Sequence, residues 1–497
     1  MESLNLLANG FIKAISLENI SYCFIGSVLG TLVGVLPGIG PTAGIALLLP
    51  LVTTLPPTGS IIMLAAIYYG SMYGGSTTAI LVNMPGEAAS VITAMDGYQL
   101  ARQGRAGSAL AIAAIGSFVA GTLGLLGLSF SASILAELAL TFGPPEYLGL
   151  VILALTVVVS LFGKSILKGM IAAFLGFLFT IPGLDPLFGI PRFTFGSSAL
   201  YGGIDYISAI VGLFAIAEVL RSAEQSLVVI FEKVGRLLPS KYELLACVRT
   251  ILRSTVVGFF LGLIPGCTPA VASFIAYDVE KRASKQPEKF GCGALEGVAA
   301  PESANNAITS AGFIPLFSLG IPPTPALAVL LGALMIYGLQ PGPLLFQLHS
   351  DFVWAVIASM YIGNVMLLIL NLPLVGLWAR IATIPYRILA PAILVLCFIG
   401  TYSIRNRMFD VWVAMSFGVM GYLMGKVDIP IFPLVMTLIL GDMLEKSVGQ
   451  MLAISRGSFS ILLGRPIALA LIGAAIILMI YSIYSRRRTK LIKKPII

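Results

Sequence analysis

The chain is 497 residues long, and 58% of its residues are hydrophobic while only 10% are charged. Together with a mean hydropathy of +0.99, this exceeds what the core of a soluble protein can bury and predicts an integral membrane protein. The formal charge of +8 comes from short basic clusters between apolar stretches, which argues against a nucleic-acid-binding protein.

Apolar stretches of helix length follow one another along the chain. They lie near residues 20–54, 60–83, 106–135, 147–162, 166–182, 203–220, 250–279, 302–339, 352–378, 386–400, 408–425, 428–444 and 466–484. The first 19 residues lack the basic-then-apolar pattern of a cleavable signal peptide, so none is expected. The predicted fold class is an all-α polytopic membrane protein with about 11–12 transmembrane spans.

Four of these stretches are interrupted by proline or glycine in mid-run, namely 20–54, 60–83, 250–279 and 302–339. Proline and glycine break a helix and free backbone N–H and C=O groups. In lipid those groups need partners from protein or water, so the breaks must face a protein interior or a cavity. The sequence therefore predicts broken helices in these four stretches.

The glycines and prolines of one break recur at a constant interval. Gly30, Gly34, Pro37, Gly38 and Pro41 each have a counterpart 228 positions later, at Gly258, Gly262, Pro265, Gly266 and Pro269. An internal duplication explains this agreement. The predicted organisation is an N-terminal segment (1–19), a first transmembrane repeat (20–235), a cytoplasmic linker (236–249), a second repeat (250–450), and an extra C-terminal span with a basic cytoplasmic tail (451–497).

Basic residues near span ends predict the orientation in the membrane. The tail from Arg486 to Lys494 and the loops around Arg102, Lys164 and Lys281 to Lys289 are expected in the cytoplasm. The stretch 250–279 then begins and ends on the cytoplasmic side, as a re-entrant hairpin does. An odd number of crossings in each half would make the two repeats inverted copies, as in many alternating-access transporters.

The two matched breaks are the first candidate site. A helix that restarts after a break presents free N–H groups and the positive end of its dipole, which suit a carboxylate. We therefore predict substrate contacts at Gly38, Gly40, Thr42, Gly266 and Thr268. A purely structural kink is the alternative, and the glycines spaced four apart before each break are typical of close helix packing.

Two polar strings inside apolar flanks, Tyr69 to Thr78 and Pro301 to Thr309, are the second candidate. Such strings are costly in hydrocarbon unless they line a pathway or a bundle interior. Substrate binding is predicted for Ser76, Thr77, Asn305 and Asn306. Binding of a coupling ion, Na⁺ or H⁺, is predicted for Asn83, Glu87, Glu302 and Ser303. Alternatively, both glutamates lie at a membrane interface and only cap helices.

Little in the sequence suggests catalysis. A single histidine, His349, excludes a His-rich metal site and a His-Glu-x-x-His protease. The five cysteines are scattered without a Cys-x-x-Cys spacing, so no disulfide and no metal is expected. No catalytic residue and no cofactor is predicted. The alternatives left open are a channel or uniporter for small organic anions and, with less support, an intramembrane enzyme.

At these same residues the chain resembles the large membrane subunit of the tripartite tricarboxylate transporters, the TctA family. The resemblance covers roughly residues 10–460. It rests on six segments: Gly34 to Thr42, Tyr69 to Thr78, Asn83 to Glu87, Gly262 to Pro269, Pro301 to Asn306 and Gly320 to Pro322. One departure is Gly320-Ile321-Pro322-Pro323, where Pro-Gly is usual in the family. That change stiffens the turn.

The resemblance implies a multi-pass subunit of the bacterial inner membrane that works with a smaller membrane subunit and a periplasmic substrate-binding protein. It also implies import of tricarboxylates or related small carboxylates by symport with Na⁺ or H⁺, without ATP. The sequence is consistent with this last point, because it contains no Gly-x-x-x-x-Gly-Lys-Ser/Thr phosphate loop.

Overall fold

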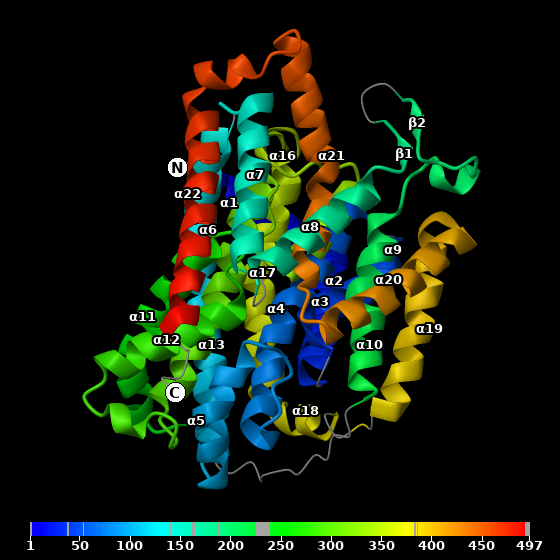
Figure 1. The fold of residues 1–497 in the computed structure, drawn as a ribbon. Coiled ribbons are helices and arrows are strands. Elements are labelled where there is room, and N and C mark those ends of the chain that lie inside the picture. Colours follow the sequence, from blue (N-terminus) through cyan, green and yellow to red (C-terminus); the bar gives the residue numbers. More distant parts are fainter. Residues whose placement is uncertain are drawn as a thin grey trace. The chain divides into compact units, whose positions relative to one another are not determined.

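The computed structural model describes residues 2–36, 39–52, 54–139, 141–161, 165–185, 189–224, 239–381, 384 and 386–492. These residues form helices almost throughout, with one two-residue antiparallel strand pair (Figure 1). The chain divides into two compact units: unit 1 comprises Met1–Glu137 and Phe214–Asn406, and unit 2 comprises Leu138–Leu213 and Arg407–Ile497. Each unit contains segments from both predicted repeats.

Unit 1 holds most of the broken helices. Its helices are α1 (Glu2–Ala14), α2 (Leu17–Val35), α3 (Gly40–Val52), α4 (Pro57–Val82), α5 (Ser90–Arg102), α6 (Ala106–Ala139, except its last two residues), α10 (Ala217–Ser222), α11 (Lys241–Gly262), α12 (Pro269–Ala283), α13 (Glu296–Ala311), α14 (Phe313–Leu319), α15 (Pro325–Ile336), α16 (Pro343–Leu348), α17 (Ser350–Asn371), α18 (Val375–Ile381) and α19 (Tyr386–Arg405). A short 3₁₀ turn, Pro287–Lys289, lies between α12 and α13.

Unit 2 is built from α7 (Pro144–Leu161), α8 (Ile166–Thr180), α9 (Tyr206–Ile210), α20 (Met408–Lys426), α21 (Ile431–Ile454) and α22 (Pro466–Ile492). Strands β1 (Gly183–Leu184) and β2 (Pro191–Arg192) follow α8, and 3₁₀ turns lie at Ser198–Leu200 and Phe459–Gly464. A π-helical turn, Val211–Ile216, leads from α9 into α10. Beside the strands, Arg192 binds Glu445 of α21, and this hydrogen bond raises the pKa of Arg192.

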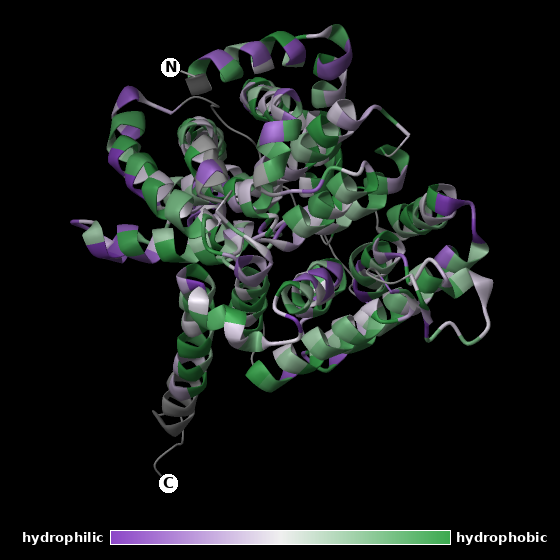
Figure 2. Ribbon diagram, turned by 90° about the horizontal axis from the view of Figure 1, so that it is seen from above, coloured by the Kyte–Doolittle hydropathy of each residue, from purple (hydrophilic) through white to green (hydrophobic). Residues whose placement is uncertain are grey.

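Eight helices of the described part are long and apolar enough to cross a membrane: α2, α6, α7, α11, α17, α19, α20 and α22. Three shorter helices, α3, α8 and α15, are apolar too. Many large hydrophobic side chains are exposed, and apolar residues run along the helices while polar residues gather mainly at their ends (Figure 2). A lipid environment accounts for such a surface. The count of about 11–12 spans stays a prediction.

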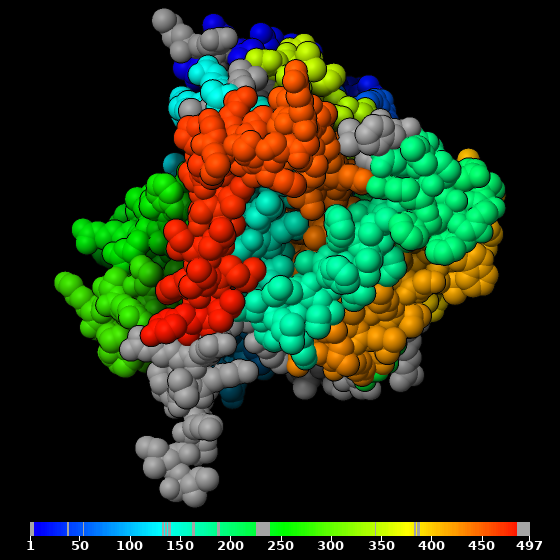
Figure 3. All heavy atoms as spheres, turned by 45° about the horizontal axis from the view of Figure 1, so that its top comes forward, coloured from blue at the N-terminus to red at the C-terminus, as the bar shows by residue number. Residues whose placement is uncertain are grey.

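The last helix, α22, has few contacts with the rest of the protein. It packs beside α7 within unit 2, and only 11% of its most apolar window, within Pro466–Tyr484, is buried. Its outer side chains are visible as a red ridge on the surface (Figure 3). An apolar helix with so few protein neighbours is stable where lipid covers the remaining surface.

Three of the four predicted breaks occur where proline and glycine stand. Helix α2 ends at Val35 and α3 begins at Gly40, α11 ends at Gly262 and α12 begins at Pro269, and α14 ends before Gly320. Helices α2, α3 and α4 therefore correspond in order to α11, α12 and α13, as a duplication predicts. The inverted, re-entrant arrangement of the two copies in the membrane stays a prediction.

The fourth predicted break is wrong. The stretch 60–83 lies in α4, which is one uninterrupted helix, and the chain turns only at Asn83, whose φ is +54°. No proline lies inside α4 beyond its first residue, so nothing removes a hydrogen bond from its interior. Three of its glycines, Gly59, Gly70 and Gly74, instead face α2, and this packing compensates for their low helix propensity.

Glycines bring α2 and α4 into backbone contact. A Cβ atom at Gly34 would lie 2.2 Å from the carbonyl oxygen of Ser71, and one at Gly74 would lie 2.3 Å from that of Thr31. Gly258 of α11 has the same relation to α13, with a Cβ 2.4 Å from the carbonyl oxygen of Ala304. The small-residue packing that the sequence suggested is therefore present in both copies.

Replacing Gly34 by alanine is expected to destabilise the protein by about 1–3 kcal/mol, because the added methyl group forces α2 away from α4. Gly473→Ala in α22 is the matched control, since nothing lies within 4 Å of its added Cβ and alanine favours a helix. Thermal unfolding of the purified protein, followed by loss of the monodisperse gel-filtration peak, measures both. Equal midpoints for the two variants would contradict the contact.

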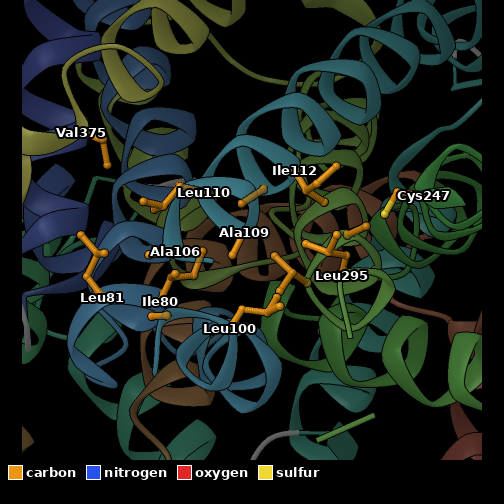
Figure 4. Packing of buried hydrophobic residues seen from close by; sticks show 14 of the residues in the cluster. Ile80, Leu81, Leu100, Ala106, Ala109, Leu110, Ile112, Cys247, Leu295 and Val375 are labelled. Atoms are coloured by element: carbon orange, nitrogen blue, oxygen red, sulfur yellow. The ribbon is translucent and has the colours of Figure 1, made fainter. Parts of the chain in front are cut away.

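A hydrophobic cluster supports the ends of α4, α5 and α6. Figure 4 shows Ile80, Leu100 and Leu110 from these helices meeting Leu295, which immediately precedes α13. All four side chains are buried. The cluster holds α4, α5, α6 and α13 together, and these are the helices that carry most of the polar residues described next.

Candidate functional site

A cavity of about 510 Å³ lies in unit 1 where four chain breaks meet. Its walls include residues 39–43 at the start of α3, 85–89 after α4, 268–270 at the start of α12 and 324–326 at the start of α15. Sites for small molecules usually measure about 300–1,000 Å³. The cavity is therefore large enough for a small organic anion.

Three helices of at least 12 residues begin at this cavity: α3, α12 and α15. Thr268 and Thr324 cap α12 and α15, and their hydroxyl oxygens accept hydrogen bonds from the N–H groups of Val271 (3.4 Å) and Leu327 (3.3 Å). Helix starts carry partial positive charge and unsatisfied N–H groups. Their convergence makes the cavity suited to negative charge.

Hydrogen bonds hold the breaks of the second copy in place. The N–H of Gly266 donates to the carbonyl oxygen of Pro323 at 3.0 Å, so the break before α12 is tied to the break before α15. Gly266 has a φ of +87°, which only glycine adopts readily. The hydroxyl of Tyr68 in α4 lies 3.3 Å from that of Thr324. The walls are thus linked across helices distant in sequence.

The charged side chains lining the cavity are both acidic. Among the described residues its wall includes Glu87 and Glu218, and no lysine or arginine. Glu218 forms an ion pair with Arg221 at 3.4 Å, whereas Glu87 accepts hydrogen bonds from neutral groups. Attraction for an anion therefore comes from the helix starts, and Glu87 opposes it whenever its carboxylate is charged.

Behind Glu87 lies a buried polar network centred on α13. Glu302, Asn305 and Asn306 share one face of that helix, because they are spaced by three and four residues. The Asn305 amide nitrogen donates to the Glu87 carboxylate at 2.9 Å, and the Asn306 amide nitrogen donates to the Ser117 hydroxyl at 2.7 Å. The network thus connects α13 to the cavity wall and to α6.

Glu302 is held by hydroxyl groups from three other helices. Its carboxylate accepts hydrogen bonds from Ser76 of α4 at 2.6 Å, Thr93 of α5 at 2.5 Å and Ser117 of α6 at 3.4 Å. Only 1% of Glu302 is exposed. The alternative in which it caps a helix at a membrane interface is therefore wrong for this residue, since it lies inside α13.

The structure divides the predicted substrate residues between the cavity and the network. Gly40, Thr42 and Thr268 line the cavity, and Gly266 fixes the break next to it. The network contains Ser76, Asn305 and Asn306. Thr77 and Ser76 line a second cavity, of about 10 Å³. Gly38 lies outside the described residues.

The predicted ion-coupling residues also separate. Glu87 and Glu302 are close to the network and the cavity, as described above. Ser303 points to another face of α13, toward Gly116, and its hydroxyl has no hydrogen-bond partner among the described residues. Asn83 is exposed and ends α4 in the left-handed conformation. The structure therefore does not bring Asn83 and Ser303 together with the two glutamates.

Sequence reasoning missed Tyr68, Thr93, Ser117 and Thr324. Thr324 could have been found, because Thr324-Pro325 repeats the Thr268-Pro269 pair that caps the start of α12. The other three are single polar groups in apolar helices, where a hydroxyl commonly bonds its own backbone. Their partners become apparent only once the helices are packed.

Comparisons with known proteins identify the family of this chain. A sequence model of the Tripartite tricarboxylate transporter TctA family matches residues 20–436. An uncharacterized 52.8 kDa protein in the TAR-I ttuC' 3' region of Agrobacterium vitis is 46% identical over 492 residues, which is 99% of this chain and 98% of that protein. An uncharacterized protein in the TAR-II ttuC' 3' region of the same organism is 45% identical over 233 residues, covering 47% of this chain and 96% of that protein.

No solved structure matches the chain. The family match spans most of the sequence, and that family is one of transporters rather than a class of enzymes. The described residues include eight apolar helices of membrane-spanning length. The chain therefore belongs to the tripartite tricarboxylate transporter TctA family and is a multi-pass membrane component of a transporter.

Proposed function

We propose that the chain is the large membrane (permease) subunit of a binding-protein-dependent secondary transporter. In this proposal it resides in the bacterial inner membrane, pairs with a small membrane subunit, and receives substrate from a periplasmic substrate-binding protein. It imports tricarboxylates or related small carboxylates by symport with Na⁺ or H⁺. The cavity at the starts of α3, α12 and α15 is the observation that carries the proposal.

Carboxylates suit this cavity for a physical reason. Each helix start contributes N–H groups and about half a positive charge, and the hydroxyls of Thr42, Thr268 and Thr324 are within its lining. A substrate with two or three carboxylates can place them at different helix starts. Arginine or lysine would bind such an anion more tightly, but a transporter must also release it.

The same broken helices provide a route to alternating access. Substrate binding would fix the breaks before α3, α12 and α15 in one arrangement, and movement of this group against the remaining spans exposes the cavity to one side at a time. The Gly266–Pro323 hydrogen bond makes the breaks of the second copy move together. Na⁺ or H⁺ would bind in the acidic network beside the cavity.

Uptake into vesicles tests the proposal. Inside-negative vesicles would carry this chain and its small partner, with binding protein outside, and would receive a broad panel of labelled di- and tricarboxylates. Sodium and proton gradients are imposed separately. We expect accumulation of at least one carboxylate that collapses with one ionophore. Downhill equilibration that needs neither gradient nor binding protein would instead identify a channel or uniporter.

A pair of variants tests whether uptake depends on the cavity. Ala270 of α12 lines it, so Ala270→Leu fills part of its volume and is expected to lower uptake at least about tenfold, the equivalent of about 1.4 kcal/mol of binding. Ala283→Leu makes the same change at an exposed position at the end of α12 and should leave uptake unchanged. Equal uptake by both variants would place the substrate elsewhere.

A further inference from the structure

Two buried carboxyl groups of unit 1 are left without a basic partner. Glu87 is 8% exposed and Glu302 is 1% exposed. In the part of the chain that the structure describes, neither forms an ion pair with lysine, arginine or histidine. Burying an uncompensated carboxylate is so costly that such a group normally becomes neutral or gains a cation. The pair therefore needs a proton or cation that the described residues do not supply.

Other buried carboxylates in the same unit are compensated within the protein. Glu280 of α12 binds Arg253 at 2.9 Å and Thr250 at 3.0 Å. Asp96 of α5 accepts hydrogen bonds from three backbone N–H groups and from Tyr277. The absence of a comparable partner is thus a property of Glu87 and Glu302, not of buried acids in this unit generally.

The positions that hold the two carboxyl groups lie about one helical turn apart on both α5 and α13. Glu87 binds Ser90 of α5 and Asn305 of α13. Glu302 belongs to α13 and binds Thr93 of α5. Both α5 partners and both α13 positions are therefore separated by three residues, a rise of about 4.5 Å along each helix. Two carboxyl groups whose partners lie this close influence each other's titration.

The surroundings of Glu302 suit a proton better than a metal ion. Two of its hydroxyl partners touch the carboxylate at 2.5 and 2.6 Å. Among the described residues no group of three or more His, Cys, Asp or Glu side chains could hold a metal ion. Hydroxyls both donate and accept, and they can therefore hydrogen-bond a carboxylate and a neutral carboxylic acid alike.

An unpartnered oxygen points to the second half of the site. The amide nitrogen of Asn305 donates to Glu87, but its Oδ1 has no hydrogen-bond partner in the described part of the chain, although the residue is only 1% exposed. Turning this amide by 180° brings Oδ1 to face Glu87. That arrangement accepts a hydrogen bond from a protonated Glu87 and satisfies the oxygen. Asn305 can therefore serve Glu87 in either protonation state.

We propose that Glu87 and Glu302 form a shared proton-binding site beside the cavity. A proton from water adds to one carboxylate and makes it a neutral carboxyl, and the same proton is released to water when that O–H bond breaks again. Only the role of this proton site rests on the proposed function. A proton on Glu87 removes a negative charge from the wall of the cavity that an anionic substrate must enter. The site deepens that function by naming the proton as coupling ion.

The remaining titratable groups around the site already have partners. On α4, Tyr73 donates to Asn364, and Tyr68 lies against Thr324. Across the cavity, Glu218 of α10 pairs with Arg221. Asp96 on α5 and Glu280 on α12 are bonded as described above. Neither α6 nor the rest of α13 within the described network adds a charged group, so titration at this place is assigned to the glutamate pair.

Infrared difference spectroscopy tests the site with the proton itself as ligand. The full-length protein in liposomes is titrated with acid and base in the absence of Na⁺, and the C=O stretching band of neutral carboxylic acids is followed. We expect a titrating band in the wild type that is lost in the double variant Glu87→Gln and Glu302→Gln. Each single variant should retain one titrating carboxyl group of the pair, and the pH midpoint of its band should differ from that of the wild type.

Glu280→Gln is the matched control, because it removes a buried glutamate that has its own arginine. Its spectrum should show the same titrating band as the wild type. Circular dichroism and gel filtration establish that each variant is folded, and glutamine at both positions keeps the size of the side chain. If the double variant does not fold, the two single variants still test the proposal, because each must shift the pH midpoint of the carboxylic-acid band.

Two results would overturn the proposal. A band that titrates identically in the wild type and in both single variants would place the proton elsewhere. Carboxylate bands that respond to added Na⁺ at constant pH, with no titrating carboxylic acid, would make the pair a sodium site. No substrate is needed, so a failure here is distinct from a failure of the uptake panel, which tests the proposed function.

Discussion

Alanine at both Asn305 and Asn306 is expected to abolish coupled uptake while the protein remains in the membrane at its normal level. Asn305 is the amide that links α13 to the Glu87 carboxylate, and Asn306 links it to Ser117. A hydrogen bond to a charged group contributes about 1.5–3 kcal/mol, so losing the Glu87 contact alone predicts a decrease of about tenfold to a hundredfold. Accumulation of the panel carboxylate in vesicles measures the effect.

The single variants separate the two contacts. Asn305→Ala should cause most of the loss, because Asn306 does not contact Glu87 among the described bonds. Asn364→Ala is the control: this buried asparagine of α17 bonds Tyr73, Phe118 and Thr122. It should lower stability but leave uptake coupled to the gradient. Full uptake by the double variant would show that α13 does not couple the ion to the substrate.

Asp96→Ala is expected to have the largest effect on stability, about 4–5 kcal/mol. One carboxylate oxygen of Asp96 accepts hydrogen bonds at 2.8–2.9 Å from the N–H groups of Gly291, Gly293 and Ala294, and the other accepts from the Tyr277 hydroxyl at 2.8 Å. Alanine leaves several buried donors without an acceptor, each costing about 1–3 kcal/mol. The loop before α13 would then lose its attachment to α5.

Two further variants make this prediction specific. Asp96→Asn keeps the oxygen that serves the three N–H groups, and the Tyr277 hydroxyl can reverse to accept from the new amide, so it should restore much of the stability. Asp278→Ala removes an exposed ion pair with Arg282 and should cost less than about 1 kcal/mol. Thermal unfolding of the purified proteins ranks them, and equal midpoints for Asp96→Ala and Asp278→Ala would contradict the assignment.

The local sequence predicted the fold correctly at positions where a single residue type determines the backbone conformation. Proline removes an N–H donor and glycine adopts a left-handed conformation, so the breaks before α3, α12 and α15 could be located from their letters alone. The same reasoning failed for α4. Glycines weaken an isolated helix, but in α4 they allow close packing against α2, and that gain depends on a neighbour that the local sequence does not reveal.

The candidate site shows the same division. Thr42, Thr268 and Glu87 were predicted from the motifs around the breaks, and all three line the cavity. The sequence also indicated that Ser76, Glu302 and Asn305 are polar groups in apolar surroundings. It could not indicate their hydrogen-bond partners, since Thr93 and Ser117 come from helices that only packing brings to α13.

The sequence by itself determined that this protein spans a membrane and where most of its helices break, and it predicts an internal duplication. These properties follow from hydropathy and backbone chemistry, which each short segment carries alone. Only the tertiary structure decided that four breaks meet at one cavity, and that two glutamates separated by 215 positions bind residues one helical turn apart on α5. Such proximity is a property of packed helices, because hydrogen bonds and close glycine contacts join segments regardless of their distance along the chain.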